Sequence, residues 1–217
     1  MRKMEITPPS LPADLEERDA AFPPAGEEVA GRTFRRQVVP PHAREHLWVS
    51  GCRFVGCSFP ASELHAAHFT DTLFSRCDLS NVKWAGCGFQ RVVFDECKLV
   101  GADFSAASWS HVLFEGCRAG WANFSEGRFR FVRFAGGELR GGVFGACRFD
   151  RVEYARCDLT EAEFRRTQLR GVSFADSDIR GLRVGEVASF ELTGLKVNAL
   201  QAVELARLLG VEIDDGL

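Results

Sequence analysis

Residues 77–106 read CDLSNVKWAGCGFQRVVFDECKLVGADFSA, and every fifth residue in this stretch is large and apolar. The pattern continues in both directions without an insertion or deletion, from Phe54 to Val184, and only Ala119 among its 27 central positions is small. A period of five matches neither the 3.6-residue period of a helix nor the two-residue period of a strand. The stretch is therefore a repeat, and this repeat decides the fold.

Sorting the central positions by a period of 20 separates four columns of different character. The column that starts at Phe54 is wholly aromatic, and the column that starts at Phe59 is mostly aliphatic; the other two start at Leu64 and Phe69. We therefore expect an all-β coil with four sides and one pentapeptide per side, and we number the sides 1 to 4 in this order. Stacked coils would pair like parallel strands, about 4.8 Å apart.

The cysteines follow the same frame, because each lies two residues before a central apolar residue. They are Cys52, Cys57, Cys77, Cys87, Cys97, Cys117, Cys147 and Cys157. Other residues at this position are almost all small or β-branched, so we expect the cysteines to pack as small buried hydrophobes. The sequence has no CxxC pair and no Cys/His cluster with ligand spacing, and we expect neither a metal nor a cofactor.

Several pentapeptides follow a known consensus. Residues 157–166 read CDLTEAEFRR, residues 77–81 read CDLSN and residues 102–106 read ADFSA. These segments fit the loose pattern Ala-Asp/Asn-Leu-x-x, and the chain resembles the pentapeptide-repeat protein family over residues 51–190. The resemblance implies a right-handed quadrilateral parallel β-helix, a pentapeptide-repeat solenoid, with a short C-terminal α-helix.

The sequence divides into four parts. Residues 1–31 hold five of the eight prolines and predict an extended arm, with one or two helical turns near residues 14–21. This arm is either a solvated leader or a segment that packs on the first coil. Residues 32–50 follow the frame imperfectly and predict an N-terminal cap. Residues 51–190 form the β-helix, and residues 191–217 form a C-terminal cap helix and dimerisation element.

The C-terminal part carries the signals of a capped helix. After Val184 the frame slips by one residue, and Phe190 and Leu195 continue it. Asn198 is placed as the N-cap and Gly210 as the stop. One apolar face should close the last coil, and resemblance to the Qnr and MfpA type of quinolone-resistance proteins implies a homodimer through the rest; a simple cap is the alternative. The expected dimer interface is Leu195, Leu200, Val203, Leu208, Leu209, Val211 and Ile213.

Charge separates side 4 from the other sides, although the net charge of the chain is only −3. Side 4 presents six arginines against two aspartates, a net charge of +4. These arginines are Arg91, Arg128, Arg130, Arg148, Arg151 and Arg170. Either the side is simply solvated, or it contacts phosphate or an acidic protein surface.

Function is expected to lie in the surface and not in catalysis. The sequence has no phosphate loop, no GxSxG and no HExxH, so we expect no enzyme. It has no run of 18 apolar residues and no secretory signal, which predicts a cytoplasmic protein with no membrane partner. Resemblance to the Qnr and MfpA type implies a DNA mimic that binds DNA gyrase or topoisomerase IV and protects it from quinolones or natural poisons. The alternatives are a general protein-interaction scaffold or nucleic-acid binding through the arginines of side 4.

Overall fold

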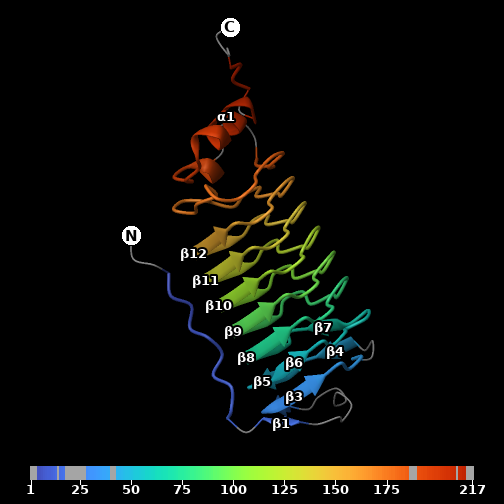
Figure 1. Cartoon of the computed structure of the whole chain (residues 1–217). Helices are drawn as coiled ribbons and strands as arrows, with labels where there is room; N and C mark the ends of the chain where they lie inside the picture. Colours follow the sequence, from blue (N-terminus) through green and yellow to red (C-terminus); the bar gives the residue numbers. More distant parts are fainter. Residues whose placement is uncertain are drawn as a thin grey trace.

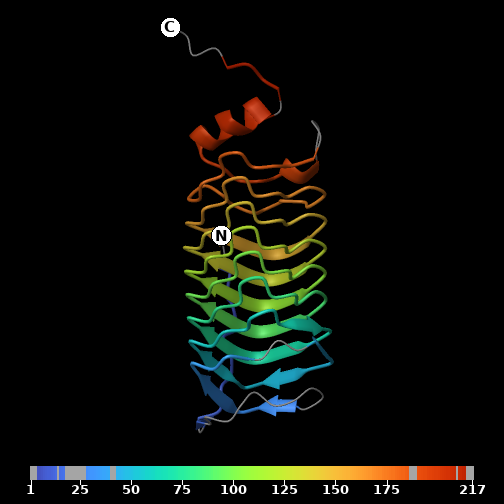
Figure 2. The same cartoon turned by 90° about the vertical axis from the view of Figure 1, so that its right-hand side faces the viewer.

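The chain forms a right-handed quadrilateral parallel β-helix that ends in a short α-helix, as a computed structural model shows (Figure 1). Successive coils stack into a straight rod, and the helix lies across one end (Figure 2). The structure describes residues 4–13, 15–17, 28–39, 43–185, 190–208 and 210–213. The expected fold class is therefore confirmed.

Strands account for most of the regular structure. Short strands form the first coils, long strands form the middle, and the chain ends with a 3-10 turn and one helix. The elements are β1 (Glu16–Glu17), β2 (Glu28–Ala30), β3 (Arg32–Arg35), β4 (Ala43–Glu45), β5 (Trp48–Ser50), β6 (Arg53–Val55), β7 (Glu63–His65), β8 (His68–Ser75), β9 (Gly88–Asp95), β10 (Ser108–Glu115), β11 (Arg128–Ala135), β12 (Arg148–Ala155), η1 (Phe190–Leu192) and α1 (Ala199–Leu208).

Neighbouring coils pair in parallel with partners 20 residues apart, as the period of 20 requires. Val112, for example, lies opposite Val92 on one side and Val132 on the other. Each of β8 to β12 runs along side 4, bends at one corner and continues along side 1. Side 2 consists of turns joined by single β-bridges, such as the bridge from Lys98 to Arg118, and side 3 does so beyond its short strand pair β4 and β7. Side 4 is therefore a regular sheet, and side 2, opposite it, is not.

The interior is a stack of identical layers. On side 1 the aromatic rings from Phe34 to Tyr154 lie parallel, with ring centroids 4.6–5.0 Å apart and planes within 10°. All eight cysteines are free and buried, which confirms their packing role. In the column from Cys57 to Cys117, each thiol donates a hydrogen bond to a carbonyl of the coil below, for example Cys97 to the Phe74 oxygen at 3.4 Å. The interior thus holds the rod together and leaves recognition to the outward residues.

The N-terminal coils begin earlier than the sequence frame indicates. Strand β2 pairs with β5, and β3 pairs with β6, so paired strands of the coil begin at Glu28. The helical turns expected near residues 14–21 are wrong for Glu16 and Glu17, which form β1 and pair with β3. Residues 14 and 18–21 lie outside the described residues. Pairing with the edge of the first coil explains the strand, because it satisfies backbone groups that the coil would otherwise expose.

The C-terminal end departs from the frame at Phe190, which is 52% exposed instead of buried. Residues 190–192 form a 3-10 turn, and this rotation brings Glu191 inside, where its carboxylate accepts the Arg166 N–H at 2.7 Å. Leu195 packs against the core as expected. Of the helices among the described residues, none has the length and apolar character that crossing a bilayer demands.

Helix α1 begins and ends where the sequence indicates. The Asn198 side chain accepts the Gln201 N–H at 2.9 Å, and the Gln201 side chain accepts the Asn198 N–H at 2.9 Å, which is a reciprocal capping box. Gly210 follows with a φ of 79°, the left-handed conformation that ends helices. The same Gln201 side chain donates to the Phe174 and Ser177 carbonyls at 2.8 and 2.6 Å. The helix is therefore fastened to the last coil by polar contacts.

Candidate functional site

Side 4 carries an open groove of about 580 Å³ that runs along the rod. Strands β5 and β8 to β12 line it, because the residues before and after each buried central residue point outward. The row before the central residues is Trp48, His68, Gly88, Ser108, Arg128 and Arg148, and the row after them includes Thr70, Gln90, Ser110, Arg130 and Asp150. The groove thus changes from aromatic at its N-terminal end to basic at its C-terminal end.

The aromatic end is a stacked pair of rings. Trp48 and His68 lie parallel, with ring centroids 4.2 Å apart and planes 19° apart, and Trp48 is 55% exposed. Gly88 makes room beside them, since a Cβ there would come within 2.7 Å of the His68 Nδ1 atom. The absence of a side chain at Gly88 therefore hollows the middle of the groove next to an exposed indole.

The basic end holds three of the six expected arginines. Arg128 and Arg148 face each other across β11 and β12 and make no ion pair with any described residue. Arg130 lies 3.9 Å from the Asp150 carboxylate, an exposed and weak pair. Like charges opposite each other in a sheet are unfavourable, so these guanidinium groups are available to an anion.

The other three expected arginines lie outside the groove. Arg91 donates two hydrogen bonds to Asp71, at 2.7 and 2.6 Å, and this guanidinium holds the pKa of Asp71 below its usual value. Arg151 lies over the Phe131 ring, with its guanidinium carbon 4.8 Å from the ring centroid. Arg170 is exposed at the last coil, beside Gly194. The structure therefore reduces the basic side to Arg128, Arg130 and Arg148 in one groove.

The N-terminal arm runs along the corner between sides 4 and 1, beside the long strands (Figure 1). Its Ser10 N–H donates to Asp71 at 2.8 Å, and its Thr7 N–H donates to the Nδ1 atom of His111 at 3.1 Å. Burial, helped by the positive charges of Arg130 and Arg91, lowers the pKa of His111 and so favours the neutral ring, which can accept this hydrogen bond. The arm packs along several coils and not on the first coil alone.

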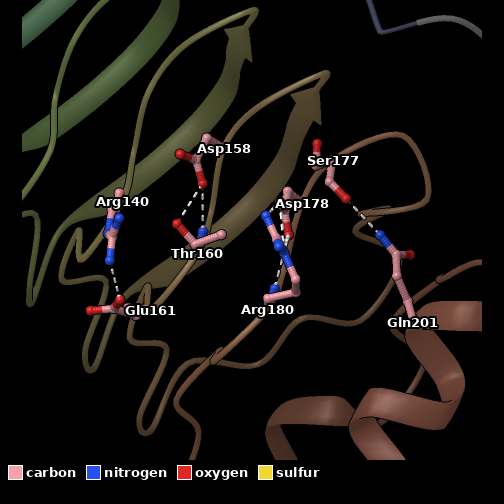
Figure 3. A network of polar contacts seen from close by, with 8 residues as sticks. All are labelled: Arg140, Asp158, Thr160, Glu161, Ser177, Asp178, Arg180 and Gln201. Carbon is pink, nitrogen blue, oxygen red and sulfur yellow. Dashed lines mark hydrogen bonds and ion pairs between the residues drawn. The ribbon is translucent and has the colours of Figure 1, made fainter.

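Side 2 carries many charges, and several of those near its C-terminal end are paired within the chain (Figure 3). Arg140 lies 2.5 Å from Glu161, and Arg180 lies 2.5 Å from Asp178. Asp158 accepts hydrogen bonds from the N–H and hydroxyl of Thr160 at 2.9 and 2.7 Å. These contacts leave side 2 with few uncompensated charges near the C-terminal end.

The described part of the chain lacks a cluster of metal ligands, and its buried thiols are poorly reactive. No three His, Cys, Asp or Glu side chains among those residues gather closely enough to hold a metal ion. Burial raises the pKa of Cys87 and of Cys147 to about 12, so these thiols are not nucleophiles at neutral pH.

The expected dimer residues divide into two groups. Leu200, Leu208, Val211 and Ile213 are exposed, and Leu200 is 81% exposed, whereas Leu195 and Val203 are half-buried. Leu209 lies outside the described residues. The C-terminal element therefore leaves apolar residues that the rod does not cover. The sequence predicted this, because the element is apolar on more than one face.

Two exposed tryptophans were not expected to matter from the sequence. Trp48 precedes the run of 27 repeats, and Trp121, which is 57% exposed, lies at an outward position of side 2. The exposure of both tryptophans could have been predicted from the sequence, because the five-residue frame assigns each of them to an outward position.

Comparison with known proteins places the repeat in a wider group. The family profile described as a pentapeptide repeat region matches residues 67–144, and the profile of pentapeptide repeats in eight copies matches residues 144–181. Together they span residues 67–181, which is 115 of the 217 residues. No curated protein matches the chain.

Solved structures with a similar arrangement share little sequence with this chain. HetL, a pentapeptide repeat protein involved in heterocyst differentiation regulation in the cyanobacterium Nostoc sp. strain PCC 7120, is 12% identical with a TM-score of 0.39, over 78% of this chain and 86% of HetL. Full-length QnrB1, a plasmid-mediated fluoroquinolone resistance protein, is 19% identical with a TM-score of 0.32, over 85% of this chain and 99% of QnrB1.

Proposed function

The chain belongs to the pentapeptide-repeat family, and we propose that it is a non-catalytic binding protein that holds an anionic partner along side 4. The observation that carries this proposal is the pair Arg128 and Arg148, which face the same groove without an ion pair to any described residue. A cytoplasmic location, expected from the sequence, is part of the proposal. The rod itself suits a protein-interaction scaffold, because it offers a long surface and buries its cysteine thiols.

Retention on a heparin column tests this proposal, because heparin is a polyanion without bases or peptide groups. We expect the chain to be retained at low salt in spite of its net charge of −3. Arg128→Glu with Arg148→Glu should elute at clearly lower salt. The matched control is Lys98→Glu with Arg118→Glu, two residues that are also 20 apart but lie on side 2. Equal loss in both variants would show that only net charge matters and would overturn the proposal.

A second candidate function is binding to DNA gyrase or topoisomerase IV as a DNA mimic, with protection from quinolones or natural poisons. The resemblance to the Qnr and MfpA type implies it, and the exposed apolar surface of α1 favours it, since that surface suits a homodimer. The candidate stands second because a DNA mimic needs an acidic surface. Residues 50–190 hold 18 Lys/Arg and 17 Asp/Glu, and side 4 is basic.

Gyrase supercoiling and drug-stabilised cleavage, each measured with and without the protein, separate the two candidates. The second candidate predicts inhibition of supercoiling or loss of quinolone-stabilised cleavage at micromolar protein. No change in either activity would refute it and leave the first proposal intact.

The homodimer is proposed to form through the exposed apolar residues of α1 and of the segment that follows it, which are Leu200, Leu208, Val211 and Ile213. Leu200→Glu with Val203→Glu should give a monomer by light scattering, while the parent chain gives a dimer. Glu204→Gln, on the same helix, is the matched control and should leave the dimer intact. A monomeric parent chain would contradict the dimer directly.

A further inference from the structure

We propose that the groove of side 4 binds a single strand of nucleic acid, with a base stacked on Trp48 and phosphates held by Arg128 and Arg148. The inference rests on the proposed function, because it names the chemical class of the anionic partner. Three features of the groove carry it: an exposed ring pair, an uncharged hollow and a row of free guanidinium groups.

The ring pair is a preformed stacking platform. Trp48 lies on His68 with ring centroids 4.2 Å apart, which fixes the indole, and more than half of its surface remains exposed. Glu28 occupies the equivalent position in the coil below, at the end of this side of the rod. Bases stack on exposed aromatic rings with little regard to sequence, so this end suits any unpaired base.

The middle of the groove is uncharged and open. Gly88 has no side chain, and Gln90, Ser108 and Ser110 offer an amide and two hydroxyl groups. These groups donate and accept hydrogen bonds, so they suit base edges, sugars or phosphate oxygens without choosing a sequence.

The basic end lies within reach of the same strand. Trp48 and Arg148 are five coils apart, which is about 24 Å at the usual spacing of parallel strands. Arg128 lies one coil nearer, and Arg130 lies beside it on β11. A bound phosphate would relieve the repulsion between Arg128 and Arg148, because each guanidinium would then face an anion instead of its neighbour.

An acidic peptide or a DNA duplex fits these features less well. An acidic peptide would use the arginines but would leave the Trp48 platform without a planar partner. A duplex keeps its bases paired and stacked, so it also cannot use an exposed ring. A single strand is the polyanion that uses both ends of the groove.

Fluorescence anisotropy with 5′-fluorescein-labelled dT12 tests the proposal on the full chain at low salt. We expect Trp48→Leu to weaken binding about 5- to 150-fold, the range for losing one stacked base. The matched control is Trp121→Leu, which removes an equally exposed tryptophan from side 2 and should leave binding unchanged. Arg128→Glu with Arg148→Glu should weaken binding and reduce the salt slope by about 1.4, since two phosphate contacts are lost.

Intrinsic fluorescence gives a second readout that does not depend on affinity alone. Unlabelled dT12 should quench the parent chain and Trp121→Leu but not Trp48→Leu, and circular dichroism confirms that each variant is folded. Failure of dT12 to bind, or binding and quenching that do not depend on Trp48, would overturn the inference. So would equal or tighter binding of poly-glutamate or of duplex dA12·dT12. If one of these results is found but heparin retention still depends on Arg128 and Arg148, the proposed function stands. Only the identification of the anionic partner as a single strand of nucleic acid is then refuted.

Discussion

Sides 4 and 2 lie opposite each other on one rod and share its core, but their outward residues are arranged differently. Side 4 is a regular sheet whose outward rows form a groove, with Arg128 and Arg148 left without ion pairs to any described residue. Side 2 consists of turns and bridges, and its charges near the C-terminal end are paired at short distances, as Arg140 is with Glu161 (Figure 3). Each side also bears one exposed tryptophan, Trp48 or Trp121.

The difference shows where function can reside in a repeat of this kind. On every side the inward residues are buried in the shared core, so only the outward residues of a side can contact a partner. Pairing between coils then decides which outward charges remain available. On this ground we propose side 4 as the binding surface, because side 2 pairs several of its charges near the C-terminal end.

The largest expected effect comes from breaking the interior that both sides share. Phe114 is buried in the aromatic column of side 1, stacked between Phe94 and Phe134. Phe114→Ala should lower the free energy of unfolding by about 3–5 kcal/mol, because it leaves a cavity. Urea unfolding measures this loss, and Phe114→Leu, which keeps most of the volume, should cost less than about 1.5 kcal/mol. A negligible loss in Phe114→Ala would refute the inward assignment on which the comparison of sides depends.

The next effect concerns the joint between the rod and α1, where the polar contacts of side 2 continue into Gln201 (Figure 3). Gln201→Ala removes the donor to the buried carbonyls of Phe174 and Ser177 and should cost about 1–3 kcal/mol. Glu204→Ala, on the exposed part of the same helix, should change stability by less than about 0.5 kcal/mol. Equal effects in thermal melts would mean that Gln201 does not fasten the helix.

Acid should weaken the corner of side 4, where Arg91 pairs with Asp71. This pair and the Ser10 N–H favour the ionised carboxylate, so the folded-state pKa of Asp71 is lower than the unfolded value of about 3.9. The contribution, about 1–2 kcal/mol, is present above the unfolded pKa and is lost as pH falls through the lower folded one. Urea unfolding measured from pH 5 downward, through the unfolded pKa of about 3.9, measures the loss. Asp71→Asn should be less stable at neutral pH and show a shallower acid loss, and an unchanged profile would contradict the role of the pair.

The smallest expected effect is the change in stability when one arginine on each side is replaced by glutamate, and its sign should differ between side 4 and side 2. Arg128→Glu places an acid opposite Arg148 and should raise stability by about 0.2–1 kcal/mol at low salt. Arg140→Glu places an acid beside Glu161 and should lower stability by a similar amount, about 0.2–1 kcal/mol. Chemical denaturation at two salt concentrations measures both, and high salt should shrink both changes. Losses of the same sign on both sides would remove the distinction between free and paired charges.

The sequence predicted the interior better than the surface. A period of five assigns inward and outward positions residue by residue, so the aromatic column and the buried cysteines followed directly. The prediction that Phe190 is buried was wrong, because a 3-10 turn rotates the chain where the frame slips. A five-residue period carries no information about such a local turn.

Only three of the six arginines expected on the binding side line the groove, and counting charges along a side ignores pairing between coils. Arg91 lies 20 residues after Asp71, so the period itself predicts that the two face each other. The position of the arm beside His111 has no such periodic signal, because the contact of Thr7 with His111 joins residues 104 positions apart. Trp48 was missed because it precedes the regular run, although it occupies an outward position of the same frame.

Hydroxyl-radical footprinting of the full chain, with and without saturating dT12, tests the central claim most directly, because it reads both exposed tryptophans in one sample. The account predicts that oxidation of Trp48 falls on binding while oxidation of Trp121 stays unchanged. Protection of Trp121 in place of Trp48, or protection of neither, would contradict the assignment of side 4 as the binding surface.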